Sequence, residues 1–299
     1  TAPRADTGLG ASAPTHLLIC AFHYDRRRAI FFRSDPFSPA SGLPARAPVT
    51  LADAVHASTN APVRYFKDPA LTAPAPGRAS ANGQLAPTDA TRCWDGGVAA
   101  FNNPIMAGLI EAKSAAQTLG GGATRVRVLS IGTGTTERPP ASDAPRGMED
   151  SPLFAPVVEA GMRADLEHLA TAVLADPPDA ATFQAHVLMG GGLPREMGTH
   201  IRPADLVRLN PMVQGVFESA RGWRYPEGIA LGNESPREAF EALVNLDMDA
   251  VRQEDVERIE RFGRAWIDGR VRNQLIRGDT ERTKWSIGHP TFEEGKRAW

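Results

Sequence analysis

Apolar runs of strand length open the chain, separated by stretches rich in proline and polar residues. Residues 16–22, HLLICAF, form an apolar run that predicts a buried strand. Residues 29–33, AIFFR, predict a second strand, and the polar residues 25–28 favour a turn, so the two strands should pair as a hairpin. A loop is expected over residues 34–48, which contain Pro36, Pro39, Pro44 and Pro48.

A short helix is expected over residues 51–58, because Thr50 is suited to cap it and Leu51, Ala54 and Val55 fall on one face. A second stretch of prolines and glycines, residues 68–90, predicts a surface excursion, since core-like segments lie on both sides of it.

The most regular pattern follows this excursion. Residues 92–98, RCWDGGV, predict a strand end that opens into a glycine turn, and Asn103 and Pro104 are suited to start a helix. Apolar residues at helical spacing predict its core face: Ile105, Met106, Leu109, Ile110 and Ala112. Gly120 to Gly122 would end the helix, and residues 126–132 predict a further strand. Strand, helix and strand in this order predict a βαβ unit and a parallel sheet.

The second half has a weaker pattern. After a connector over residues 139–150, residues 153–174 predict a helix, and residues 179–217 mix a helix, a GGG turn and a strand at residues 206–210. From Arg237 onward the chain is charged and mainly helical in pattern. Its expected inner stripe consists of Val251, Ile259, Phe262 and Trp266.

Composition fits a globular protein with a sizeable core, because 42% of the 299 residues are hydrophobic and 23% are charged. The net charge of -2 argues against nucleic acid or an anionic membrane surface as a partner. Two cysteines, Cys20 and Cys93, are too few for a disulfide framework, so a reducing compartment and a cytoplasmic location are expected.

Hydropathy predicts no transmembrane segment, since no run approaches the roughly 20 apolar residues that a span needs. Residues 1–14 lack the apolar region of a secretory signal, and the chain begins with Thr rather than Met. A processed precursor and a partial sequence both explain that start. Membrane contact is expected to be peripheral at most.

One carboxylate stands out among residues that carry chemistry. Asp95 ends an apolar strand and is followed by Gly96 and Gly97, which allow close approach of backbone or substrate. Ligand sites of open α/β sheets lie at the carboxyl ends of strands. A carboxylate there can act as a general base if burial raises its pKa from about 3.9. The structural alternative is an Asp-Gly turn that caps the next helix.

The pattern D-G-G-V-x-x-x-N-N-P resembles the second catalytic motif of the patatin-like phospholipase family, whose DG[GA] aspartate is the base of a Ser–Asp dyad. Three further segments resemble this family in the same order, namely residues 16–34 its central hairpin, residues 51–66 its RATSAAPxYF segment, and residues 125–135 its next strand and glycine turn. His56 and Asn60 depart from the second pattern. The short motifs NPM (210–212), LDMDAV (246–251) and NQLIR (273–277) resemble a bacterial branch.

The resemblance implies a partial three-layer α/β/α patatin-like fold. Residues 1–215 would form the patatin-like domain without its N-terminal nucleophile block, and residues 216–299 a helical C-terminal extension. It also implies a lipid acyl hydrolase acting on a lipid or acyl-ester substrate. A serine attacks the ester carbonyl, Asp95 takes its proton, backbone amides hold the oxyanion, and water releases the fatty acid. No metal or organic cofactor is implied.

The nucleophile of that chemistry is missing, because no G-x-S-x-G occurs in the sequence. Ser12 and Ser286 come nearest, but each lacks a required glycine, and neither is assigned. The chain is then a fragment of a longer enzyme, a natural pseudo-hydrolase, or a partner that borrows its serine from another chain. The functional alternative is a catalytically dead patatin-like protein that binds lipid or acts as a scaffold.

The other sequence patterns give weaker evidence for a functional site than the motif around Asp95. Gly132-Thr133-Gly134 lacks the third glycine of a dinucleotide site, and Gly190 to Gly192 suits a turn. Seven scattered histidines predict no metal site. The run Arg26-Arg27-Arg28 suits a solvated turn, with contact to a phosphate as the alternative.

Overall fold

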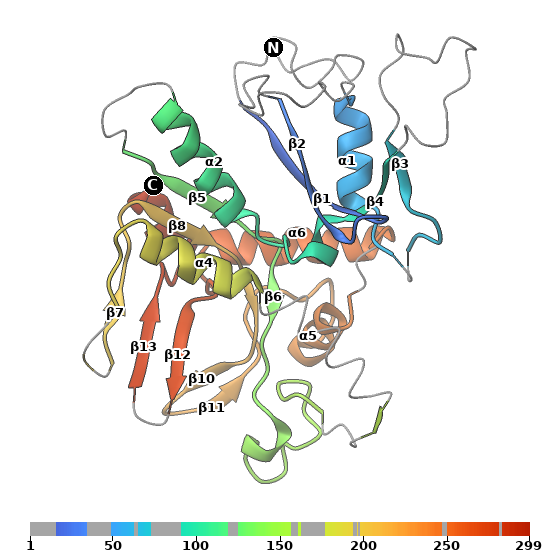
Figure 1. Cartoon of the computed structure of the whole chain (residues 1–299). Helices are drawn as coiled ribbons and strands as arrows, with labels where there is room; N and C mark the ends of the chain where they lie inside the picture. Colours follow the sequence, from blue (N-terminus) through green and yellow to red (C-terminus); the bar gives the residue numbers. More distant parts are fainter. Residues whose placement is uncertain are drawn as a thin grey trace, which may run out of the picture. The chain divides into compact units, whose positions relative to one another are not determined.

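The computed structural model describes residues 16–34, 49–62, 65–72, 91–118, 125–156, 161–162, 177–193, 196, 198–246, 250–280 and 283–299 (Figure 1). In this part of the chain, helices combine with several small sheets, so the predicted α/β class is confirmed at that level. The chain divides into two compact units. The N-terminal unit comprises Thr1–Gly108 and Leu169–Ala181, and the C-terminal unit comprises Leu109–His168 and Thr182–Trp299.

A four-stranded sheet forms the centre of the N-terminal unit. Its strands are β1 (Leu18–His23), β2 (Arg28–Arg33), β3 (Ala70–Thr72) and β4 (Thr91–Asp95). They lie in the order β2-β1-β4-β3, and every neighbouring pair is antiparallel. The predicted hairpin of the first two strands is therefore confirmed.

Helix α1 (Leu51–Thr59) covers one face of this sheet (Figure 1). As predicted, Thr50 caps it, because its hydroxyl oxygen accepts a hydrogen bond from Asp53 N at 3.1 Å. The helix and sheet enclose a small core made of Ala21, Ile30, Phe32, Ala54, Ala57 and Cys93. The small side chains Ala54 and Ala57, both fully buried, let the helix approach the strands closely.

The 3₁₀ turn η1 (Gly96–Ala99) and helix α2 (Ile105–Thr118) follow β4. Asn103 starts the helix as predicted, because its Oδ1 accepts a hydrogen bond from Ile105 N at 3.3 Å. Ile105 and Leu109 are buried, whereas Ile110, expected on the same face, is 55% exposed.

The predicted βαβ unit takes a different form. Strand β5 (Val128–Ile131) pairs in parallel with β8 (Leu206–Leu209), and β6 (Thr135–Thr136) pairs in parallel with β9 (Met212–Val213). Parallel pairing is thus confirmed, but β4 is not the partner of β5. The reason is geometric, because β1 and β3 already occupy both edges of β4.

Polar contacts join the carboxyl ends of β5 and β8. Asn210 Oδ1 accepts a hydrogen bond from Gly134 N at 2.9 Å, and Asn210 Nδ2 donates to Gln274 Oε1 at 2.6 Å. A side chain at Gly132 would overlap both Asn210 and Arg208. The segment from Gly132 to Gly134 is therefore a tight crossing that leads into β6.

The remaining elements are η2 (Ala141–Asp143), α4 (Pro177–Leu188), β7 (His200–Ile201), β10 (Val216–Glu218), β11 (Gly222–Arg224), α5 (Pro236–Val244), α6 (Gln253–Ile267), β12 (Ile276–Thr280), β13 (Thr283–Ile287) and α7 (Phe292–Ala298). Strands β12 and β13 form a hairpin, and β7 joins β13 in parallel. The C-terminal region is therefore not only helical, which corrects the expected helical extension. Residues 153–156 form a turn and a bridge rather than the start of a helix, and most of residues 157–176 lie outside the described part.

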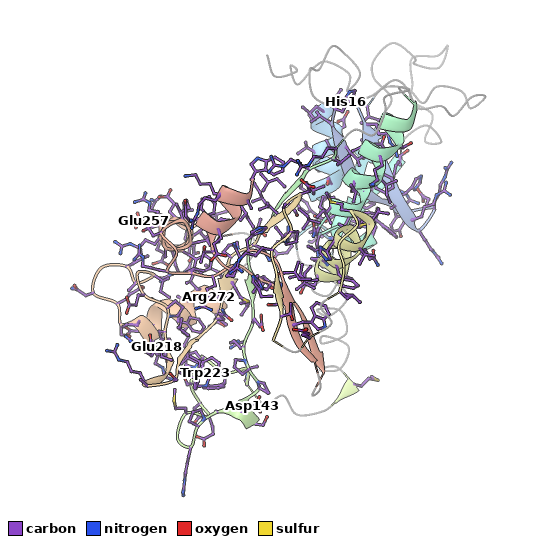
Figure 2. All side chains as sticks on the ribbon, turned by 90° about the vertical axis from the view of Figure 1, so that its left-hand side faces the viewer. His16, Asp143, Glu218, Trp223, Glu257 and Arg272 are labelled. Carbon is purple, nitrogen blue, oxygen red and sulfur yellow. The ribbon has the colours of Figure 1, made fainter. Side chains whose placement is uncertain are left out.

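A hydrophobic cluster in the C-terminal unit holds α5 and α6. It contains Leu153, Phe154, Val213, Ile229, Ala239, Phe240, Leu243, Phe262, Ala265 and Val271. Trp223, which is labelled in Figure 2, packs against this cluster. The ring of Trp223 meets that of Phe154 edge to face, with centroids 5.4 Å apart.

The buried stripe of α6 differs from the predicted one. Phe262 is buried as expected, but Ile259 is 47% exposed, and Val251, which precedes the helix, is 85% exposed. The helix instead buries Arg258, whose guanidinium donates to both carboxylate oxygens of Glu234 at 2.8 and 2.9 Å. This bidentate ion pair allows an arginine to replace an apolar residue in the stripe.

Glu234→Gln should therefore lower the free energy of unfolding by about 1–3 kcal/mol, because the buried Arg258 loses its counter-charge. The ion pair lowers the pKa of Glu234 from 4.5 to about 2, so the ionised carboxylate stabilises the fold above pH 4.5. The difference between the variant and the natural protein should shrink as pH falls from 4.5 toward about 2. Urea unfolding at several pH values measures it.

The matched control is Glu260→Gln, which removes an exposed carboxylate paired with Arg264 at 3.3 Å on the same helix. Its effect should stay within about 0.5 kcal/mol. Equal destabilisation by the two substitutions would contradict the special role of the Arg258 pair.

Candidate active site

Asp95 is the last residue of β4 and lies opposite Ala21 of β1. Its backbone N–H donates to the carbonyl oxygen of Asn60, the residue that ends α1, at 3.0 Å. Strand pairing on one side and this hydrogen bond on the other fix the backbone that presents the carboxylate. The expected position of Asp95 at a strand end is confirmed, although the strand belongs to an antiparallel sheet.

The carboxylate of Asp95 caps the turn that follows. Its Oδ1 accepts a hydrogen bond from Gly97 N at 2.5 Å, at the start of η1. The capping role that the Asp-Gly pattern allowed is thus present. Among the residues that the structure describes, Oδ2 has no hydrogen-bond partner, so one oxygen stays open to a further group.

Burial decides the protonation of this group. Removal of water raises the pKa of Asp95 above its ordinary value, and the Gly97 N–H opposes that rise only in part. A half-buried carboxylate with a raised pKa is a stronger base than an exposed one, which is what proton abstraction requires.

The two glycines after Asp95 allow the backbone of the turn to pass close to neighbouring atoms. A Cβ at Gly96 would stand 2.6 Å from the carbonyl oxygen of Cys20, so only glycine lets this turn cross over β1. A Cβ at Gly97 would overlap Oδ1 of Asn102 and lie 3.0 Å from Oδ1 of Asp95. Both glycines are buried, and both shape the turn as predicted.

A hollow of about 490 Å³ opens beside this turn. It is lined by Phe22, Tyr24, Asp25, Arg27, Pro62, Trp94 and Val98. Trp94 and Phe22 are cross-strand partners, and their side chains lie on the face opposite the one where Ala21 and Cys93 pack with α1. The volume lies in the range of roughly 300–1,000 Å³ that small-molecule sites occupy. The hollow therefore offers an aromatic surface next to the residues that flank Asp95.

Two further residues support the site, although no sequence pattern marks either of them as part of it. Ser58 Oγ donates to the Cys20 carbonyl oxygen at 2.6 Å, and Asn60 Nδ2 donates to the Asp68 carbonyl oxygen at 3.0 Å. Asn60 is 1% exposed, and in the sequence it is only a departure from the RATSAAPxYF pattern. In the structure it positions Asp95 through its own backbone.

Neither serine considered as a nucleophile acquires that role. Ser12 lies outside the described residues. Ser286 lies within β13, and its hydroxyl is hydrogen-bonded to His200 Nδ1 at 2.8 Å. The neighbouring N–H groups of Ser286 and Gly288 donate to carbonyl oxygens of the β7 region, so they are not available to hold an oxyanion. The pair is therefore not assigned a catalytic function.

The described residues contain neither a metal-binding cluster nor a helix that could span a membrane. Among the described residues, no three His, Cys, Asp or Glu side chains are grouped so that they could hold a metal ion. Cys20 and Cys93 are both buried, and no disulfide joins them. No helix in the described part of the chain combines the length and the apolar character needed to cross a bilayer.

Gly96→Ala should lower the free energy of unfolding of the N-terminal unit by about 1–3 kcal/mol, because the new methyl group meets backbone at Cys20 that cannot move aside. Gly108→Ala is the control. It lies in α2 with nothing within 4 Å of the added Cβ, so it should be neutral or stabilise by up to about 1 kcal/mol. Thermal unfolding of both variants compares them, and equal tolerance would contradict the close crossing.

Comparison with known proteins adds no assignment. No protein-family model matches the chain, and no curated protein matches its sequence. The resemblance to the patatin-like phospholipases therefore rests on the four motifs and on their order.

Proposed function

We propose that the protein is a lipid acyl hydrolase in which Asp95 is the base of a Ser–Asp dyad. The observation that carries the proposal is the half-buried Asp95 carboxylate at the end of β4, with one oxygen held by Gly97 and the other unpartnered among the described residues. A hollow lined by Trp94 and Val98, on either side of the turn that Asp95 begins, offers aromatic surface for an apolar substrate, although Asp95 itself does not line it.

The proposed reaction has two steps. A serine hydroxyl attacks the ester carbonyl while Asp95 Oδ2 takes its proton, and the alcohol leaves with that proton, so an acyl-serine forms. Water then attacks the acyl-serine, and Asp95 again accepts and returns a proton as the fatty acid departs. Throughout, Gly97 N–H holds Oδ1 and fixes the direction in which Oδ2 points. The serine comes from a G-x-S-x-G segment that these 299 residues do not contain.

The proposal includes the fold that this chemistry would use. We propose that the β1–β2 hairpin, β4 and the parallel β5–β8 pair are parts of a three-layer α/β/α patatin-like domain over residues 1–215, with residues 216–299 as an extension. A cytoplasmic location with peripheral contact to a membrane accompanies this proposal. Parallel pairing of β5 with β8 supports it, whereas the antiparallel sheet of β4 is a departure from the expected βαβ unit.

The alternative is a lipid-binding or scaffold protein without catalysis. It is favoured by the hydrogen bond from Gly97 N to Asp95, because that bond gives the carboxylate a structural purpose that needs no serine. The hollow would then bind lipid without turning it over.

Asp95→Asn should abolish hydrolysis of a p-nitrophenyl acyl ester by the whole protein, with a loss of about 10²–10⁴-fold in kcat. Asparagine still caps the turn, so the free energy of unfolding should not fall. In the natural protein, kcat/KM should rise with pH through the pKa of Asp95, which lies above the ordinary 3.8 because of burial. Steady-state kinetics between pH 4 and 8 measure this limb.

The control is Asp68→Asn, which alters an exposed carboxyl in the same unit and should leave kcat unchanged. Full activity in Asp95→Asn would refute the dyad. Absence of hydrolysis by the natural whole protein, combined with tight binding of lipid, would favour the scaffold alternative.

A further inference from the structure

Two charged residues line the hollow, Asp25 and Arg27, and they differ in whether another side chain neutralises them. Asp25 forms an ion pair with Arg92, and the Arg92 guanidinium also stacks over the Tyr24 ring, 4.6 Å from its centroid. This pairing holds the pKa of Asp25 below its usual range, so the carboxylate stays ionised with its charge matched. The acidic residue of the rim is therefore already neutralised.

Arg27 has no such partner. It lines the hollow from the β1–β2 turn, and among the described residues no hydrogen bond or ion pair involves its side chain. Its backbone is in the left-handed region, with φ of 50°, which is uncommon for a residue with a side chain. The turn thus presents an unmatched cation beside an aromatic surface.

The rest of the hollow is apolar or aromatic. Phe22 and Trp94 lie side by side on neighbouring strands, Pro62 follows α1, and Val98 projects from η1. Tyr24 and Val98 are 44% and 39% exposed, although apolar surface of this kind is usually buried or used for binding. A site with an apolar surface and a cation at one end is complementary to a molecule with a tail and an anionic head.

We propose that this hollow binds a single-chain amphiphile with a carboxylate or phosphate head. The tail lies against Phe22, Trp94 and Val98, and the head pairs with Arg27. As a statement about substrate class this inference rests on the proposed function, because the hollow is built in part by Trp94 and Val98, which lie on either side of the Asp95 turn. As a statement about binding it does not require catalysis.

Comparison with Arg26 and Arg28 separates binding in the hollow from a general attraction of anions. Arg26 lies in the same turn and Arg28 begins β2, and both carry the same charge as Arg27, but neither lines the hollow. A general attraction of the cationic turn for anions would depend on all three arginines alike. A head group bound in the hollow depends on Arg27.

Titration calorimetry tests the proposal by measuring the affinity of the 299-residue chain for four ligands: dodecyl phosphate, dodecanoate, dodecanol and inorganic phosphate. Each amphiphile is used below the concentration at which it forms micelles. The two anionic amphiphiles should bind about three- to tenfold more tightly than dodecanol, and inorganic phosphate alone should not bind measurably. Each methylene group added from decyl to dodecyl phosphate should tighten binding by up to about fourfold.

Arg27→Gln should remove the preference for the anionic amphiphiles and leave dodecanol binding unchanged. Arg26→Gln, the matched control, should keep the preference. Val98→Ala should weaken the binding of dodecyl phosphate and of dodecanol to the same extent, because it removes part of the apolar surface that contacts the tail. Circular dichroism and thermal unfolding verify that each variant is folded.

Equal effects of Arg26→Gln and Arg27→Gln, binding of inorganic phosphate as tight as that of dodecyl phosphate, or no binding of any amphiphile would overturn the proposal. Asp95→Asn should bind dodecyl phosphate like the natural chain. A protein that binds as expected but hydrolyses no ester loses only the proposed function, and one that hydrolyses esters without dependence on Arg27 loses only this inference.

Discussion

The end of β4 depends on two hydrogen bonds that meet at Asp95. Its N–H is held by the Asn60 carbonyl, and its carboxylate holds the N–H of Gly97. Between them they join α1, the sheet and the η1 turn, so the direction of the carboxylate is set by three elements at once. Gly96 makes this arrangement possible, because a larger residue could not pass the Cys20 carbonyl. The carboxylate that we propose as the catalytic base is therefore also the cap of the turn.

Local patterns predicted the elements whose causes lie close together in the chain. The β1–β2 hairpin, the Thr50 cap and the start of α2 at Asn103 each depend on residues a few positions apart. The β12–β13 hairpin was missed because its segment is charged, and the exposure of Ile259 was missed because its helix buries Arg258 instead. That exchange depends on Glu234, 24 positions away, which no periodicity reveals.

The site was predictable in part for the same reason. The motif around Asp95 identified the carboxylate and the two glycines, since turn chemistry is local. The hollow was not predictable, because Tyr24, Pro62 and Val98 come from three separate segments that only the folded sheet brings together. The difference between Arg27 and its neighbours also requires coordinates, since the three arginines are equivalent in the sequence.

The parallel contact of β7 with β13 has a consequence for how the chain folds. Its partners Ser286 and His200 are 86 positions apart, and β13 is the only neighbour of β7 in the described sheets. Closing so long a loop is entropically slow, and during synthesis β7 emerges well before its partner exists. The backbone groups of His200 and Ile201 therefore find their strand partner only after residues 283–287 have been synthesised, so the sheet around β7 should form late.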